Sequence, residues 1–307
     1  MTDELLRDLA DVADVPTRPV AQIQARARQL RVRRRRSRSA AAAVTLSGAL
    51  VMASVIGFGP GPSGSSSATA SQVLIAAGAA AGEQPGGWPE ATYWYVASEI
   101  QYTGEDPYRR QSWIPRDPVL EGALQDPGVF GPDASLGADG VHTGSLGPTW
   151  FHAGGAIDWA GLYALPTDPV ELERILRSDY NPDGASENEQ LWESVKSLLV
   201  GTPAPPALRQ ALWEVTATIP GVELTGRVTD AAGRPGIAVE RDDRANGRQM
   251  ERLVVDPDEG RLLQIEQYTQ DGVLAWRMTL LEQRPADTAP ETDPPICGPG
   301  SEPHRSC

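Results

Sequence analysis

Residues 222–282 read VELTGRVTDAAGRPGIAVERDDRANGRQMERLVVDPDEGRLLQIEQYTQDGVLAWRMTLLE, and this stretch decides the fold. Apolar and polar residues alternate in five segments of it, as is typical of strands with one buried face. Short turns with Gly, Pro, Asp or Asn separate the segments. Consecutive strands joined in this way predict an antiparallel meander. The five predicted strands are Val222–Val228, Ile237–Arg241, Arg252–Asp256, Leu262–Thr269 and Val273–Glu282.

Three one-sided helices precede this meander. Asp168 and Ser186 are N-capping residues for the first two, and the third follows the proline-rich break at 203–206. Apolar residues recur three and four positions apart in each helix, so each has one face to bury. Helices on one face of an antiparallel sheet make an α+β fold. The apolar stripes are Leu172, Ile175 and Leu176; Leu191, Trp192, Val195, Leu198 and Leu199; and Leu208, Ala211, Leu212, Val215 and Ile219.

Further elements are expected before these helices. Ser71–Ala81 (SQVLIAAGAAA) predicts a helix that ends at Gly82. The aromatic and β-branched stretch Thr92–Tyr102 predicts a strand, with Tyr108–Ile114 as its partner across a GEDP turn. Residues 116–155 are rich in Gly, Pro, Asp and Ala without any period. They are either a mobile functional loop or contain strands that the pattern does not reveal.

An uncharged stretch, Ala40–Phe58 (AAAAVTLSGALVMASVIGF), divides the chain. A helix of this length spans roughly 28 Å, close to the hydrocarbon thickness of a bilayer. A retained transmembrane helix is favoured, because the preceding basic region and the apolar run are both longer than in a usual signal peptide. The alternative is a secretory signal that is cleaved after Ala70, behind the small-x-small sequence Ala68-Thr69-Ala70.

Charge is distributed unevenly about this stretch. Residues 1–38 hold 10 Arg against 5 acidic residues, which leaves 17 of the 27 basic and 36 of the 41 acidic residues to the remainder. By the positive-inside rule the Arg cluster at 31–38 stays cytoplasmic and the C-terminal part is exported. An acidic main domain lacks the clustered cations that bind phosphates, so nucleic acid is not expected as a partner.

The chain is therefore expected to be a single-pass protein of the cell membrane, with the lipid bilayer as one partner. It divides into a cytoplasmic basic tail (1–38), a transmembrane helix (39–58), a flexible linker (59–68), an exported α+β domain (69–284) and a disordered Pro-rich tail (285–307). Leu5, Leu6, Leu9 and Val12 recur at helical spacing in the basic tail, which either docks on a cytoplasmic regulator or frays.

Signatures of catalysis are lacking in the sequence. The candidate bases His142 and His152 lie in the irregular region, where a solvent-exposed histidine is the simpler interpretation, and no nucleophile elbow or phosphate-binding loop accompanies them. Acidic pairs are interpreted as turn and cap residues: Glu187/Glu189, Asp242/Asp243 and Asp256/Asp258. We therefore expect no enzyme activity, no catalytic, cofactor-binding or metal-binding residue, and no cofactor.

Two groups of side chains leave alternatives open. Cys297 and Cys307 either close a small disulfide loop or remain two exposed thiols. Eight aromatic residues either line an apolar cavity between sheet and helices or fill the core: Tyr93, Trp94, Tyr95, Trp113, Trp159, Trp192, Trp213 and Trp276.

Three segments show a family resemblance: Leu212–Leu224 (LWEVTATIPGVEL), Asp230–Gly236 (DAAGRPG) and Asp256–Leu263 (DPDEGRLL). With the order of basic tail, apolar span, Ala-rich helix, Trp/Tyr strand and helices, they resemble a group of actinobacterial single-pass membrane proteins without an assigned activity. The resemblance implies an exported domain similar to the curved half-barrels of lipoprotein carriers and of periplasmic regulators of anti-sigma factors. It also implies a link to sigma-factor genes, although residues 1–38 lack the His and Cys pattern of a zinc-containing anti-sigma domain.

Two functions follow as expectations. The first is a non-catalytic, membrane-anchored envelope protein whose exported domain senses or binds something, with the link to sigma-factor regulation that the resemblance implies. The second is an exported carrier whose curved sheet binds a lipid or lipoprotein.

Overall fold

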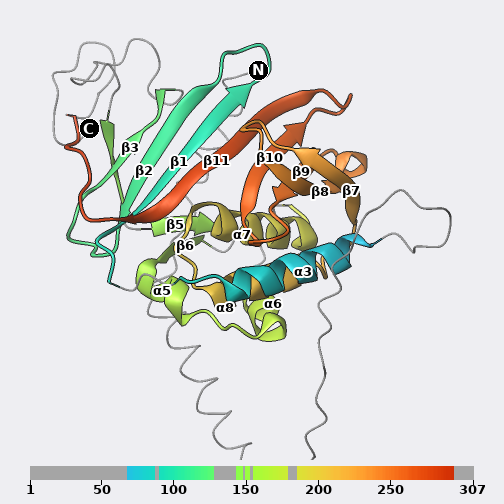
Figure 1. Cartoon of the computed structure of the whole chain (residues 1–307), viewed down its shortest axis with the longest axis horizontal. Coiled ribbons are helices and arrows are strands. Elements are labelled where there is room, and N and C mark those ends of the chain that lie inside the picture. Colours follow the sequence, from blue (N-terminus) through green and yellow to red (C-terminus); the bar gives the residue numbers. More distant parts are fainter. Residues whose placement is uncertain are drawn as a thin grey trace, which may run out of the picture. The chain divides into compact units, whose positions relative to one another are not determined.

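The structure, a computed structural model, describes residues 68–86, 90–127, 143–147, 149–152, 155–178 and 185–293 (Figure 1). The predicted basic tail and transmembrane segment lie outside these ranges, as do His142, Cys297 and Cys307. Among the helices in the described ranges, none combines the length and the apolar character needed to span a bilayer.

Within the described ranges, one antiparallel sheet of nine strands has the order β4-β3-β2-β1-β11-β10-β9-β8-β7. The predicted meander is confirmed as β7 (Val222–Thr229), β8 (Pro235–Asp242), β9 (Met250–Val255), β10 (Leu262–Tyr268) and β11 (Leu274–Ala286). The predicted hairpin is confirmed as β1 (Tyr93–Tyr102) and β2 (Tyr108–Pro115). Pairing of β1 with β11 joins the hairpin to the meander in a single sheet.

The irregular region contains strands that the sequence pattern did not reveal. β3 (Gly122–Gln125) and β4 (Thr143–Leu146) extend the large sheet beyond β2. β5 (Thr149–His152) and β6 (Gly155–Asp158) form a separate two-stranded sheet, so His152 lies in a strand and not in a loop. Of the two alternatives for residues 116–155, the one with undetected strands is confirmed for the described part of this region.

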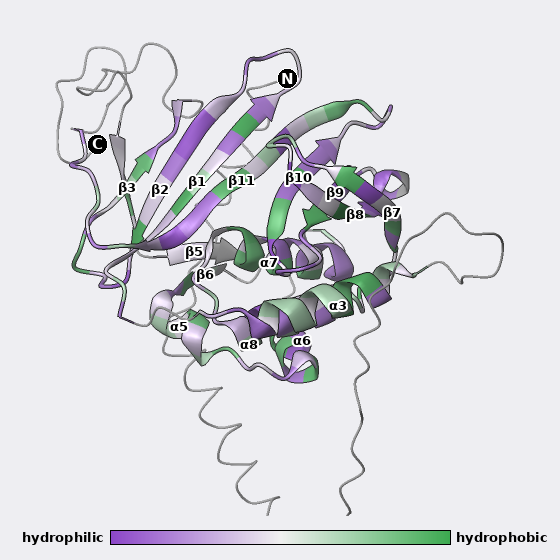
Figure 2. Ribbon diagram, viewed as in Figure 1, coloured by the Kyte–Doolittle hydropathy of each residue, from purple (hydrophilic) through white to green (hydrophobic). Residues whose placement is uncertain are grey.

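The helices pack on one face of the large sheet, which we call the inner face (Figure 1). The three predicted helices are confirmed as α6 (Pro169–Ser178), α7 (Glu187–Gly201) and α8 (Pro206–Thr216), and a short α5 (Trp159–Ala164) precedes them. The mixed α+β architecture, a large antiparallel sheet with several helices, is therefore shown. Figure 2 shows hydropathy varying along the strands and a largely hydrophobic α3.

α3 (Ala70–Glu83) begins with a capping box between Thr69 and Gln72 and continues through Gly82. The helix was expected to end at Gly82, and this is wrong because it continues to Glu83. Gly82 lies inside the helix and faces α8, where a Cβ would lie 2.4 Å from Oε1 at the end of the flexible Gln210 side chain.

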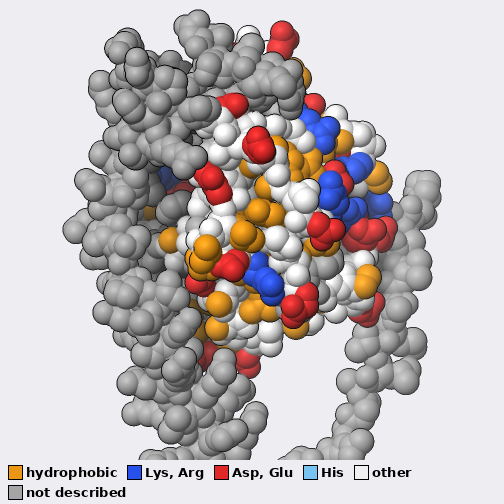
Figure 3. All heavy atoms as spheres, turned by 90° about the vertical axis from the view of Figure 1, so that its left-hand side faces the viewer, with side chains coloured by type: hydrophobic (Ala, Val, Ile, Leu, Met, Phe, Trp, Pro, Cys, Tyr) orange, Lys and Arg blue, Asp and Glu red, His pale blue; other side chains and the backbone are white. Residues whose placement is uncertain are grey.

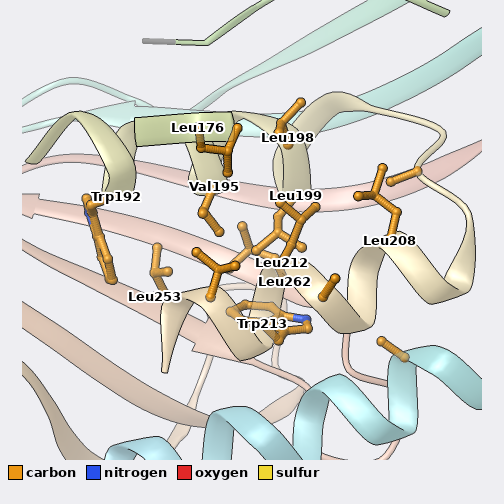
Figure 4. Packing of buried hydrophobic residues seen from close by; sticks show 14 of the residues in the cluster. Leu176, Trp192, Val195, Leu198, Leu199, Leu208, Leu212, Trp213, Leu253 and Leu262 are labelled. Atoms are coloured by element: carbon orange, nitrogen blue, oxygen red, sulfur yellow. The ribbon is translucent and has the colours of Figure 1, made fainter. Parts of the chain in front are cut away.

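Tryptophan and leucine side chains fill the core between the inner face and the helices (Figure 4). Trp94, Trp192 and Trp213 are among its largest fully buried side chains. Tyr95 and Trp113 lie on the opposite, outer face, where their tilted rings are in contact with centroids 5.0 Å apart. Of the eight aromatic residues with two expected roles, Trp94, Trp159, Trp192 and Trp213 are buried in the core. Trp276 is only partly buried against it.

β11 continues through Pro285 and Ala286, two residues past the expected domain boundary at Arg284. Further along, the backbone N–H of Asp293 donates to the carbonyl oxygen of Thr143 at 2.7 Å, and the Thr143 N–H donates to Asp293 Oδ2 at 2.8 Å. Asp293 is therefore hydrogen-bonded to the edge strand β4.

Candidate functional site

Two rows of side chains cross the inner face near one end of the sheet. The register of the strands places Tyr102, Trp276, Gln267, Glu251 and Arg241 side by side, and we call these five residues the end row. The neighbouring apolar row consists of Ile100, Met278, Ile265, Leu253 and Val239. Polar and charged groups thus replace hydrophobic ones at one boundary of the core.

α7 meets the end row with a polar stripe. Glu189, Trp192, Glu193 and Lys196 are spaced three and four residues apart, so they share one face of this helix. Ser186 caps the helix by accepting from the Glu189 N–H at 3.2 Å, which fixes the start of the stripe.

Glu251 of β9 is the centre of the contacts between α7 and the end row. Lys196 Nζ donates to its two carboxylate oxygens at 2.8 and 2.7 Å, Trp192 Nε1 donates at 2.5 Å and Gln267 Nε2 at 2.5 Å. Lys196 is the single lysine of the chain, and it also donates to Glu193 Oε1 at 2.5 Å. Lys196 and Glu251 expose only 10% and 7% of their side chains, so this ion pair is buried.

A second set of contacts surrounds Arg241 of β8, the neighbour of Glu251 in the end row. Its guanidinium donates to Glu189 and, at 3.1 Å, to Asp243 Oδ2. Asn246 Nδ2 donates to the other oxygen of Asp243 at 2.6 Å. Within the described residues, Arg241 Nε is buried without a hydrogen-bond partner.

Together these groups form what we call the charged cluster: Glu189, Glu193, Lys196, Arg241, Asp243 and Glu251. It contains four carboxyl groups against two cations. Burial lowers the pKa of Lys196, but the carboxylates of Glu193 and Glu251 outweigh it and leave that pKa raised. Burial raises the pKa of Glu251, but the ammonium of Lys196 outweighs it and leaves that pKa lowered.

These shifts decide what Lys196 can do chemically. A lysine nucleophile needs a deprotonated amine, which requires a lowered pKa. Lys196 is held as an ammonium by two carboxylates, so it serves as an ion-pair partner. The cluster thus has the properties of a structural or binding element.

Hydrophobic side chains at the same end of the sheet reach the surface. Tyr102 is 43% exposed, Trp276 is partly exposed, and so is Met278, whereas the other four members of the apolar row are buried. Val273, just before β11, is 49% exposed. Hydrophobic side chains also lie among acidic and basic ones on the face drawn in Figure 3. At this end an apolar surface therefore adjoins the charged cluster.

The acidic pairs of the sequence serve different purposes. Asp256 accepts from the backbone N–H groups of Asp258 and Glu259, as expected of a turn residue. Glu187 forms an ion pair with Arg177 of α6 at 3.3 Å, whereas Glu189 contacts Arg241 in the charged cluster. Asp242 bonds to Arg244, whereas Asp243 belongs to the cluster. The interpretation of these pairs as turn and cap residues therefore missed the roles of Glu189 and Asp243 in the charged cluster.

Similarity to known proteins is found among solved structures. A scan against protein-family models finds no match, and a search of curated proteins finds none either. Among solved structures, the chain is similar to MucB in complex with MucA(peri), with 13% identity over 72% of this chain and 57% of that chain, and a TM-score of 0.30. The chain is also similar to the MucA/MucB complex of Pseudomonas aeruginosa, with 15% identity over 72% of this chain and 58% of that chain, and a TM-score of 0.31.

A LolA superfamily protein from Nitrosomonas europaea is also similar, with 10% identity over 72% of this chain and 96% of that chain, and a TM-score of 0.24. MucB and LolA-like proteins are the kinds of structure to which the exported domain was expected to be similar. The chain spans less than two thirds of the MucB chains that it matches. TM-scores of this size carry no argument about function, which is therefore inferred from the residues of the chain itself.

Proposed function

We propose that this chain is a non-catalytic, membrane-anchored envelope protein whose exported domain binds a partner or ligand at the inner face of its sheet. The observation that carries this proposal is the partly exposed surface of Tyr102, Trp276 and Met278, which adjoins the charged cluster. Exposed aromatic side chains next to fixed charges are common anchors in protein interfaces.

The anchoring part of the proposal rests on the sequence. The uncharged stretch 39–58 follows a basic tail and precedes an acidic domain, which favours a cytoplasmic N-terminus and an exported C-terminal domain. The tail at 1–38 would then couple the bound state of the exported domain to a cytoplasmic regulator, with sigma-factor regulation as the suggested pathway.

A carrier of lipids or lipoproteins is the second candidate. The partly exposed side chains of Trp276 and Met278 favour it, because they border the buried Ile100 and Ile265 and such an apolar surface suits an acyl chain. A carrier does not need its basic tail to contact another protein. The two candidates therefore differ in whether the tail binds a cytoplasmic protein and in whether the inner face binds a protein or a lipid.

Photocrosslinking in intact cells separates these candidates. A photoreactive phenylalanine analogue replaces Trp276 in the full chain, and the control carries it at the exposed position Glu223 on β7. A protein adduct specific to position 276 supports the partner-binding function, and a lipid adduct supports the carrier. Adducts that are identical at the two positions contradict binding at the inner face.

The coupling of the tail is tested separately. A crosslinker placed within residues 1–38 is expected to capture a cytoplasmic protein, and deletion of Met1–Asp14 is expected to abolish that capture. Protease accessibility in spheroplasts reports topology. An exported domain found free in solution would contradict the anchor and favour the carrier.

A further inference from the structure

We propose that the partner of the exported domain is a protein with a cationic, partly apolar segment, which docks on the exposed apolar end of the sheet. This step rests on the proposed binding function and specifies the chemistry of what binds. Arg or Lys side chains of the segment contact carboxylates around the docking surface, and its apolar side chains cover Tyr102 and Trp276.

The apolar part of this surface consists of side chains at the ends of β1 and β11. Tyr102 is 43% exposed and Val273 is 49% exposed, and Trp276, which lies opposite Tyr102 in the sheet, is partly exposed. The backbone N–H of Thr103 donates to the Ala275 carbonyl oxygen at 3.1 Å, which holds the turn after β1 against the start of β11. The three apolar side chains are therefore gathered at one end of the sheet. Aromatic rings in such a position bind apolar groups and, through their faces, cations.

Carboxylates follow and precede these side chains in the turns. Glu105 and Asp106 come shortly after Tyr102 in the turn to β2, and Asp271 lies two residues before Val273 in the turn to β11. We call Glu105, Asp106 and Asp271 the acidic rim. All three are exposed, and within the part of the chain that the structure describes none of them forms an ion pair. The acidic rim therefore has charge that a partner can complement.

The turn after β8, at the same end of the sheet, is balanced in charge. Arg244 donates to both carboxylate oxygens of Asp242 at 2.9 and 2.7 Å. The other two charged residues of this turn are Asp243 and Arg248. With two charges of each sign, the turn does not neutralise the acidic rim.

α7 adds negative charge beside the docking surface. Glu193, whose side chain is 39% exposed, shares the ammonium of Lys196 with the buried Glu251. Glu189 is paired with Arg241. Three carboxyl groups thus meet two cations where α7 contacts the end row.

Arginines of the neighbouring strands point to the other face of the sheet. Arg109 of β2 donates to the hydroxyl of Tyr95 at 3.3 Å, and Tyr95 lies on the outer face. Arg277 of β11 donates to Gln101, which precedes Tyr102 in β1 and so points to the outer face as well. These two cations therefore do not face the docking surface.

The excess of negative charge decides the class of partner. The acidic rim repels an acidic segment or the head group of an anionic lipid, and it attracts a cationic segment. A neutral acyl chain gains nothing from it. An apolar centre with a charged border is also the usual composition of a specific protein interface.

Binding of two short labelled peptides to the full chain, held in nanodiscs of neutral lipid, tests this partner chemistry. Both peptides carry Leu at alternate positions, and the remaining positions are Arg in one peptide and Glu in the other. Fluorescence anisotropy, with empty nanodiscs as the blank, gives the dissociation constants. The Arg peptide is expected to bind about tenfold more tightly, and this preference should shrink as the salt concentration rises.

A triple variant tests whether the acidic rim causes the preference. Glu105→Gln/Asp106→Asn/Asp271→Asn should weaken binding of the Arg peptide on the order of tenfold. All three residues lie in exposed turns, so the fold should be retained, which circular dichroism checks.

The matched control removes three exposed carboxylates elsewhere in the described chain. Glu83→Gln/Glu223→Gln/Glu291→Gln changes the net charge by the same amount and should alter the affinity by less than about twofold. Equal weakening in the two triple variants would show that the peptide responds to net charge alone, and it would overturn the proposal.

Two further outcomes separate this proposal from the function on which it rests. Equal affinities for the Arg and Glu peptides, both lowered by Tyr102→Ser, would overturn the cationic partner and support binding at this surface. Absence of binding by either peptide would also overturn the cationic partner, whereas photocrosslinking at position 276 would still decide the proposed function.

Discussion

At the scale of single residues, Lys196 neutralises a buried carboxylate. It donates to both oxygens of Glu251, and the two side chains expose only 10% and 7% of their surface. Removing one partner of a buried ion pair leaves an uncompensated charge, which costs about 3–5 kcal/mol. We therefore expect Lys196→Met to lower the free energy of unfolding by about that amount.

Urea unfolding followed by tryptophan fluorescence measures this loss. All eight Trp residues lie after residue 68, so the signal reports on the predicted exported domain. The double variant Lys196→Met/Glu251→Gln should recover most of the loss, because the buried group at position 251 is then neutral and only Glu193, whose side chain is 39% exposed, has lost its cation. Arg174→Met removes the exposed partner of Glu171 and should cost less than about 1 kcal/mol. Equal losses in Lys196→Met and Arg174→Met would contradict the role of Lys196.

The sequence contained a signal for this site that its first interpretation missed. In β9 the inward positions are Glu251, Leu253 and Val255, so alternation alone places a carboxylate on the apolar face. The single lysine stands in a helix with Glu193 three residues earlier, which is consistent with an ion pair. That Lys196 also reaches Glu251, 55 residues away, depends on tertiary packing and could not be predicted from local pattern.

At the scale of elements, the turn between β9 and β10 fits against α3 because it contains Gly260. This residue has φ of +63°, and a Cβ there would lie 2.1 Å from the carbonyl oxygen of Ala77. Trp213 Nε1 of α8 donates to the Gly260 carbonyl oxygen at 2.8 Å. An alanine at this position would have to displace α3 from the sheet.

Gly272→Ala provides the matched control for Gly260→Ala. Gly272 also has a positive φ, +80°, but its nearest neighbour is Arg244 Nη1 at 3.6 Å. Both variants carry the cost of a left-handed alanine, about 1–2 kcal/mol. Gly260→Ala should lose about 1–3 kcal/mol more, because it also overpacks the contact with α3. Thermal unfolding of the two variants gives this difference, and similar melting temperatures would contradict it.

Elements with a clear period could be predicted, and those without one could not. The meander strands have six or more residues, with strict alternation of burial in β7, and the helices carry long apolar stripes, so their types were correct. β3, β4, β5 and β6 have four residues each, too few to show alternation, and Gly-rich sequence surrounds them. Their pairing is set by neighbouring strands.

At the scale of the whole described domain, the pairing of β1 with β11 joins two halves that are far apart in sequence. Tyr93 lies opposite Ala286, and Tyr102 lies opposite Trp276. Such non-local pairing adds a large loop-closure cost and leaves no local mark in the sequence. It explains why a hairpin and a meander could each be predicted while their union in one sheet could not.

The end of this pairing makes the C-terminal boundary testable. A chain that stops after Arg284 loses the partners of Tyr93 and Trp94 in β11, and also Asp293 with its two hydrogen bonds to Thr143, one through its backbone and one through its side chain. At about 1 kcal/mol for each hydrogen bond lost, its melting temperature should fall by roughly 5 °C or more against a chain that stops after Asp293. In the longer chain, Asp293→Ala removes the bond from the Thr143 N–H and should produce a smaller fall. Equal melting temperatures for the two truncated chains would show that the domain ends at Arg284, as the composition alone predicted.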